Sequence, residues 1–286
     1  MRALWVAAAL AASALAEEPR WPAAGAPLQA QRVEVPSGFG KRRVYIDAGH
    51  GANGNPGVGS VRCEQEMDFT LRVAEHLARS LEQTGHFTAR VSRQAGEAVS
   101  YPGRLRAAAD FRADAIISLH ADARGMAYAW EAAPGMVCFR NDATPGFSVL
   151  YSDRGAPALN AARQKLARSV ARRMSLAGML AYDGRDYPGL YLDDKDQAGA
   201  FIDRRQLYLL RKPAVPSIIV ETHHFLDLEE ATRWQEPRTL EAFAAAVSAA
   251  LVEALGPEAT AAGRPGGVPA NATAATPAAG WTGTAN

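Results

Sequence analysis

Residues 115–122 read AIISLHAD, an apolar run that passes directly into a histidine and an aspartate. Two further segments have the same form, VYIDAGH at 44–50 and SIIVETHH at 217–224. Apolar runs of this length indicate strands that are buried on both faces of a sheet. In open α/β sheets, binding sites form just beyond the carboxyl ends of the strands. We therefore expect these segments to bring their polar residues to one edge of a sheet.

Segments with helical periodicity lie between these apolar runs. From Glu64 to Thr84, apolar residues recur three and four positions apart, which is typical of a helix with one buried face. These residues are Met67, Leu71, Ala74, Leu77, Ala78 and Leu81. Further helices are expected at 102–112, 156–180 and 237–255, and a further strand at 87–91. The alternation predicts an α/β fold, a single domain whose twisted sheet is mostly parallel or mixed and carries helices on both faces.

The two ends of the chain differ in composition from its middle. Residues 1–16 contain one arginine, an apolar stretch and an Ala-Leu-Ala cleavage pattern, which indicate a signal peptide and export to the periplasm or beyond the cell. The apolar stretch is too short to span a bilayer, so no membrane span is expected after cleavage. Residues 17–42 read as a linker or irregular lead-in, and residues 257–286 as a disordered low-complexity tail. The folded domain is thus expected over 43–256.

The composition narrows the class of protein and leaves one covalent question open. Lys and Arg number 31 against 30 Asp and Glu, so the net charge of +1 gives no reason to expect nucleic acid as a partner. Hydrophobic residues make up 48%, which favours a globular protein over a disordered one. Cys63 and Cys138 could pair in an oxidising compartment, or could be two small buried residues. The sequence does not decide between these alternatives.

The residues at the expected sheet edge are suited to binding a metal ion. His50 and His120 each follow an apolar run directly, and the third ligand could be Glu66, His223 or His224. Zinc takes histidine and carboxylate ligands and keeps one position for water in a catalytic site. Bound zinc makes water a nucleophile near neutral pH, and a nearby carboxylate can carry its proton to a leaving amine. The glycine-rich loop after His50 lacks the Gly-Lys-[Ser/Thr] ending of a phosphate-binding loop, so we expect it to wrap closely around the His50 site.

Four motifs occur in a fixed order along the chain: IDAGHG at 46–51, EMDFTL at 66–71, SLHADA at 118–123 and PSIIVE at 216–221. Each motif is moderately specific, but the ordered combination resembles the zinc-dependent N-acetylmuramoyl-L-alanine amidases of bacterial cell walls, the type-3 amidases. The resemblance extends over residues 43 to about 255. It implies that the domain hydrolyses the amide bond between N-acetylmuramic acid and L-alanine in peptidoglycan, in wall remodelling, daughter-cell separation or lysis.

The resemblance also implies roles for individual residues. His50, Glu66 and His120 would hold one Zn²⁺ ion per chain, and Glu221 would be the general acid and base. Glu66 is preferred to Glu64 because the family's helix begins with Glu, a variable residue, Asp or Asn, and an apolar residue. The sequence EMDF, which starts at Glu66, matches that pattern.

Three positions are candidates for assisting these residues or binding substrate. The family loop after the first histidine usually ends in Asp-Pro-Gly, whereas this chain has Asn55 and one extra residue. This departure could change how the loop supports His50. The family follows its catalytic Glu with a small residue, Gly and Phe, where this chain has Thr-His-His-Phe. His223 could therefore assist substrate binding or proton transfer, or be satisfied by its neighbours. The family tends to carry an arginine on the helix before the SLHAD strand, a place that Arg104 or Arg106 could fill.

A long segment separates the last two motifs. The 101 positions from His120 to Glu221 exceed what a minimal member of the family needs, and they include an aromatic, acidic loop at 182–196. Long loops in compact domains are often lids or binding loops, so we expect part of this segment to cover the cleft and gate it. The alternative is a surface excursion that packs on the sheet.

The sequence is also compatible with two other functions. The chain could be a zinc peptidase that cuts within the stem peptide of peptidoglycan, or an inactive module that binds the wall. The presence of all four expected site residues weighs against the inactive module. We expect a monomer that recognises peptidoglycan through its cleft. The sequence does not show whether a protein activator is needed.

Overall fold

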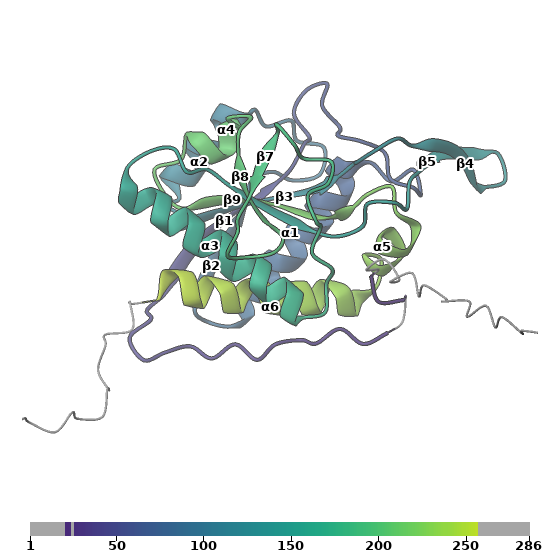
Figure 1. Cartoon of the computed structure of the whole chain (residues 1–286). Helices are drawn as coiled ribbons and strands as arrows, with labels where there is room; N and C mark the ends of the chain where they lie inside the picture. Colours follow the sequence, from purple (N-terminus) through teal and green to yellow (C-terminus); the bar gives the residue numbers. More distant parts are fainter. Residues whose placement is uncertain (1–20, 24–25, 257–286) are drawn as a thin grey trace, which may run out of the picture. The chain divides into compact units, whose positions relative to one another are not determined.

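The computed structural model describes residues 21–23 and 26–256 of the chain (Figure 1). The expected signal peptide at 1–16 and the expected tail at 257–286 lie outside the described residues. Within the described part of the lead-in, no helix or strand occurs before β1 (Arg42–Ala48) begins.

A seven-stranded sheet forms the centre of this domain (Figure 1). Its strands stand in the order β2 (Phe87–Val91), β1, β3 (Ala115–Asp122), β9 (Ser217–His224), β6 (Ser148–Tyr151), β8 (Ala200–Asp203) and β7 (Tyr191–Asp193). The first four strands in this order are parallel, whereas β6 is antiparallel to β9, and β7 is antiparallel to β8. The predicted α/β fold with a mixed sheet is confirmed.

Helices cover both faces of the sheet, as predicted. α1 (Glu66–Gln83), α3 (Pro157–Leu176) and α6 (Pro237–Leu255) pack on one face, where α3 lies alongside α6 (Figure 1). α2 (Tyr101–Asp110) and α4 (Tyr208–Arg211) pack on the opposite face, and the short α5 (Leu228–Arg233) follows β9. The layers bury both faces of the central strands, which is why those strands read as continuous apolar runs.

Alternation along β1 shows how one strand serves both layers. Val44 and Ile46 enter the main core, which also contains Leu77 of α1. Tyr45 points to the other face, where it packs in a cluster with Ala108 of α2. Successive side chains of a strand point to opposite faces, so an all-apolar strand needs a partner layer on each side.

Two helix ends coincide with glycines in the left-handed backbone region. The helix expected over 64–84 spans Glu66–Gln83, and Gly85 follows its C-cap residue with a φ of +75°. The helix expected over 156–180 ends earlier, at Leu176, and Gly178 has a φ of +93° just beyond its C-cap. Glycine adopts this backbone at little cost and commonly terminates helices.

The strands that lead to the site are longer than the apolar runs that predicted them. β3 continues to Asp122 and β9 to His224, and the two strands pair with His120 opposite Glu221. The apolar pattern stops earlier because polar side chains follow, but the backbone ladder does not depend on side-chain polarity. His120 and Glu221 therefore stand on the sheet itself and not in the loops that follow it.

A separate hairpin is attached to the domain by a disulfide bond. β4 (Tyr128–Ala133) and β5 (Met136–Arg140) form a two-stranded antiparallel sheet that reaches away from the main sheet (Figure 1). Cys138 of β5 is bonded to Cys63, which lies just before α1. The indole Nε1 of Trp130 donates a 2.7 Å hydrogen bond to the carbonyl oxygen of Val61. The pairing that the sequence left open is thus made in the structure.

Replacing Cys63 and Cys138 together by alanine should lower the free energy of unfolding by about 2–4 kcal/mol, because the bond closes a long loop and restricts the unfolded chain. Urea denaturation of the oxidised wild type and the double variant measures the difference. Reduction of the wild type provides the matched control and should give a similar loss. Equal unfolding free energies in oxidised and reduced protein would contradict the prediction.

Candidate metal and catalytic site

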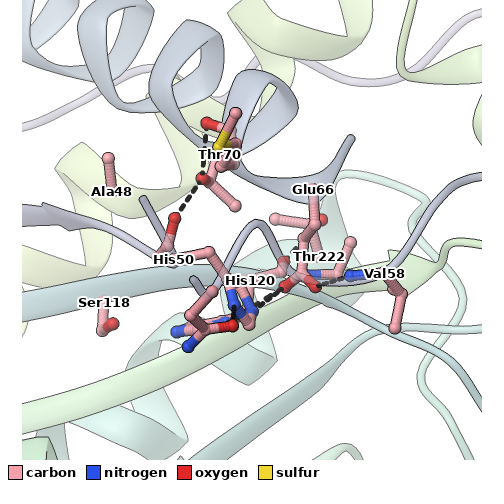
Figure 2. Close-up of polar contacts among 12 residues, drawn as sticks. Ala48, His50, Val58, Glu66, Thr70, Ser118, His120 and Thr222 are labelled. Carbon is pink, nitrogen blue, oxygen red and sulfur yellow. Dashed lines mark hydrogen bonds and ion pairs between the residues drawn. The ribbon is translucent and has the colours of Figure 1, made fainter. Parts of the chain in front are cut away.

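Three side chains from separate elements converge at the carboxyl ends of the parallel strands (Figure 2). His50 follows β1, Glu66 is the first residue of α1, and His120 lies on β3. Glu66 Oε1 lies 2.9 Å from His50 Nε2 and 3.1 Å from His120 Nδ1, and the two nitrogens are 3.1 Å apart. Two imidazoles and one carboxylate are a donor set that zinc commonly takes. Their convergence fits a metal ion.

The loop backbone is shaped to let these side chains meet. His50 itself has a φ of +60°, a conformation that costs about 1–3 kcal/mol for a residue other than glycine. A Cβ at Gly49 would lie 2.4 Å from the carbonyl oxygen of Leu119, and one at Gly57 would lie 2.6 Å from Glu66 Cβ. Both distances are too short for real contacts, so glycine is required at each position. The loop wraps closely around the cluster, as the sequence indicated.

Asn55 orients the ring of His50. The amide oxygen of Asn55 lies 2.9 Å from His50 Nδ1, and its Nδ2 donates a 2.9 Å hydrogen bond to the hydroxyl of Tyr101. When Asn55 accepts from Nδ1, the ring presents Nε2 to Glu66 and His120. Metal-binding histidines are commonly oriented in this way through their second nitrogen. Asn55 thus supports His50 although it differs from the aspartate usual in the family.

Arg104 lies beneath the loop and not in the pocket. Its side chain is fully buried and forms a 2.9 Å ion pair with Asp47 Oδ1. It also donates hydrogen bonds to the carbonyl oxygens of Ala48 and His50. Asp47 additionally accepts from the hydroxyl of Ser118 at 2.6 Å. Arg104 therefore fixes the backbone that carries His50, whereas the other arginine considered, Arg106, is exposed.

A second buried arginine was not singled out from the sequence. Arg93 donates from Nε to the carbonyl oxygen of Ala48 at 3.1 Å and from Nη2 to that of Gly49 at 3.1 Å. Its Nη2 also bonds to the carbonyl oxygen of Met67 in α1. It follows β2, a strand with no polar motif, so no local signal marked it. Arg93 links the His50 loop to the helix that begins with Glu66.

The three side chains interact strongly through charge and hydrogen bonding. Burial raises the pKa of Glu66, but hydrogen bonds and charges from His120 and His50 outweigh it and lower the pKa to about 2. Burial lowers the pKa of each histidine, but hydrogen bonding to Glu66 outweighs it and raises both above the ordinary value. An ionised carboxylate is therefore held between two imidazoles, with all ligand atoms within 4.8 Å of one another.

Glu221 faces the same pocket from the neighbouring strand. It lies opposite His120 in the β3–β9 register and lines the cavity with the three convergent residues. Burial and then the charge of Asp122 raise the pKa of Glu221 well above its usual range. A carboxyl group that exchanges its proton near neutral pH is suited to acid–base catalysis.

His223 and His224 do not join the cluster. His223 is fully buried and packs against Phe69, Phe225 and Trp234, with ring centroids 5.1, 5.6 and 5.4 Å away. Burial holds the pKa of His223 well below its usual range, which suits a neutral core residue. His224 is also fully buried, and its backbone N–H donates to Glu230. Among the candidates for a third ligand, the geometry brings Glu66 to the two histidines.

A cavity of about 380 Å³ opens above the cluster. Its wall combines strand-end residues with residues from the long segment before β9; the latter are Tyr191, Arg205, Leu207, Tyr208 and Leu209. The loop at 182–196 thus contributes Tyr191 to the pocket. Tyr187 packs below Tyr191 with ring centroids 4.6 Å apart and donates a 2.6 Å hydrogen bond to Asp122 Oδ2. The segment forms one wall of the pocket; the expectation that it opens and closes remains a prediction.

This chain matches the model of a known protein family. The model of the N-acetylmuramoyl-L-alanine amidase family matches residues 44–253, which is more than half of the chain. Among curated proteins, no match is found.

Solved amidase structures share the fold. Ami1 from Mycobacterium smegmatis has a TM-score of 0.61 at 21% identity and covers 77% of this chain and 99% of its own. The apo form of Ami1 from Mycobacterium abscessus has a TM-score of 0.59 at 19% identity and covers 76% and 99%. An N-acetylmuramoyl-L-alanine amidase from Clostridium difficile 630 has a TM-score of 0.56 at 20% identity and covers 74% and 95%. At these identities the likeness concerns the fold.

Replacing Arg104 by alanine should lower the free energy of unfolding by about 3–5 kcal/mol, because the charge of Asp47 would stay buried without its partner. Arg106→Ala is the matched control on the same helix, and since Arg106 is exposed, its effect should stay within about 0.5 kcal/mol. Chemical denaturation measures both. Similar values for the two variants would show that the buried ion pair does not stabilise the loop.

Proposed function

This chain belongs to the N-acetylmuramoyl-L-alanine amidase family and is a hydrolase of peptidoglycan, and we propose that it works with one Zn²⁺ ion per chain. The family match confirms the resemblance found in the four sequence motifs. We assign the metal ligands as His50 Nε2, Glu66 Oε1 and His120 Nδ1. The observation that carries this assignment is the convergence of these three atoms from three separate elements.

A Zn²⁺ ion held by these residues would supply Lewis acidity, which lowers the pKa of water so that hydroxide is available near neutral pH. The protein supplies the geometry and the proton transfers. His50 is oriented by Asn55, and its loop is held by Arg104 and Arg93, so the donor atoms are fixed before substrate arrives. Such preorganisation reduces the reorganisation that the reaction would otherwise require.

We propose Glu221 as the general base and then the general acid. Its carboxylate takes a proton from the attacking water and delivers it to the nitrogen of L-alanine as the amide bond breaks. Its position on β9, opposite His120, supports this role because the carboxyl group lines the cavity that the ligands also line. Its raised pKa allows the group to hold the proton between the two transfers.

We further propose that the enzyme is exported and acts as a monomer. Among the described residues, no helix combines the length and the apolar character that crossing a membrane requires. The sequence of residues 1–16 supports export by a signal peptide to the periplasm or the exterior, where peptidoglycan lies. We propose that a monomer is the acting unit and that its pocket recognises peptidoglycan. Activity of the purified chain alone would show that it requires no protein activator.

The Glu66→Ala variant should lose zinc, whereas Glu64→Ala should retain it. Glu64 is a matched control because it lies two residues away and pairs with Arg72 at 3.0 Å outside the cluster. Loss of a supporting residue already weakens metal affinity by about 10–100-fold, so loss of a ligand should weaken it further. Metal analysis after dialysis against a competing chelator measures the zinc per chain. Full retention in Glu66→Ala would refute the ligand assignment.

The Glu221→Gln variant should retain zinc but lose about 10²–10⁴-fold in the rate of peptidoglycan cleavage, because the amide side chain cannot take a proton. Mass spectrometry of digested sacculi should show peptides that begin with L-alanine in the wild-type digest. Shortened peptides still attached to sugar would instead indicate a stem-peptide peptidase. Unchanged cleavage by Glu221→Gln would remove Glu221 from the mechanism.

A further inference from the structure

One side chain with a permanent positive charge lines the pocket beside three carboxyl groups. Glu66, Asp122 and Glu221 contribute carboxyl groups to the cavity. Arg205 is the one arginine or lysine among the described residues that line it. A cation at this position attracts an anionic group of whatever molecule fills the cavity.

The backbone around Arg205 is fixed by a neighbouring carboxylate. Asp203, at the end of β8, accepts a 2.8 Å hydrogen bond from the backbone N–H of Arg205 through Oδ1. It accepts another of 2.8 Å from the N–H of Leu207 through Oδ2. Both oxygens of Asp203 are thus used to hold the turn. The turn therefore presents Arg205 to the pocket in one backbone conformation.

The guanidinium of Arg205 is held by a neutral partner. Its Nη1 donates a 2.9 Å hydrogen bond to the hydroxyl of Tyr191, and its Cζ lies 5.9 Å from the centroid of that ring. Within the described part of the chain, no carboxylate oxygen forms an ion pair with Arg205. The preceding Arg204 differs, since it pairs with Asp153 at 3.1 Å. Arg205 is exposed, so its remaining donors are available to a ligand.

Resting on the proposed amidase function, we propose that Arg205 binds a free carboxylate of the stem peptide next to the scissile bond, and so determines substrate specificity. The cavity is small, so its wall reaches groups close to the amide that is cut. In peptidoglycan the residue after L-alanine is a glutamate joined through its side chain, which leaves its α-carboxylate free unless it is amidated. A guanidinium matches a carboxylate with two parallel hydrogen bonds, a geometry that a carboxamide cannot reproduce.

The alternative is that Arg205 serves to hold Tyr191 in place. That role would make Arg205 important for every substrate equally. If Arg205 instead binds a carboxylate, kcat/KM should differ between two substrates of which only one carries that charge. The ratio of kcat/KM for two such substrates separates the two roles.

The test uses two synthetic disaccharide-tetrapeptides that differ in one group, a free α-carboxylate or a carboxamide on the second residue. Wild-type full-length enzyme should cleave the carboxylate substrate with a kcat/KM about tenfold higher, the size expected from one charge-assisted contact. In Arg205→Gln the ratio between the substrates should fall to about one, mainly through a higher KM for the carboxylate substrate. Arg204→Gln is the matched control and should keep the wild-type ratio.

A second variant tests the support of Arg205. Tyr191→Phe removes the hydroxyl that Arg205 contacts but keeps the ring, so it should lower the ratio to a value between those of wild type and Arg205→Gln. Thermal unfolding of each variant checks that the fold is intact. A ratio near one in wild type, or an unchanged ratio in Arg205→Gln, overturns the inference and leaves the amidase function standing. Cleavage of neither substrate by the wild type, or cleavage at another bond, overturns the proposed function together with the inference.

Discussion

The carboxylate of Glu66 is ionised although the residue is only 3% exposed, and the site is built around that charge. Burial alone would favour the neutral acid, because removing a charge from water is costly. His50 and His120 compensate from one side, and the backbone N–H groups of Ala121 and Val58 donate to its two oxygens at 3.2 Å. As the first residue of α1, Glu66 also lies at the positive end of the helix dipole. A divalent cation at the same point would add to this compensation.

The backbone of His50 also needs support. It adopts a positive φ, and the carbonyl oxygens of its loop accept hydrogen bonds from buried side chains. Buried carbonyl groups need donors, and here the donors are side chains instead of a sheet ladder. Arg104 and Arg93 between them bond the carbonyl oxygens of Ala48, Gly49 and His50. Arginine suits this task because its planar group offers five donors in fixed directions. The strained loop thus depends on two cations buried behind the site, neither of which lines the pocket.

Much of the fold could be predicted from the sequence because its central strands are buried on both faces and therefore have an unmistakable apolar pattern. The same pattern placed His50, His120 and Glu221 at one sheet edge. It could not choose the residue that joins the two histidines, since Glu66, His223 and His224 all follow or adjoin suitable segments. The difference arises in packing: His223 enters an aromatic cluster with Phe69 and Trp234, whereas the start of α1 carries Glu66 into the pocket. The sequence offered the Cys63–Cys138 bond only as one of two alternatives, and it indicated the segment but not the residue that Tyr191 contributes to the wall, because both depend on irregular segments without a periodic pattern.

The two walls of the pocket have different origins, and this separates chemistry from recognition. The wall that carries His50, Glu66 and His120 stands on parallel strand ends and the first turn of α1, where any shift would disturb Glu66 and its partners at once. The opposite wall comes from the long segment before β9, in which Tyr191 and Arg205 lie on turns fixed by local contacts such as those of Asp203. Changes in those turns can alter charge and shape at the pocket wall without moving His50, Glu66 or His120. Substitutions in the long segment can therefore change the pocket wall while the cluster of His50, Glu66 and His120 stays constant.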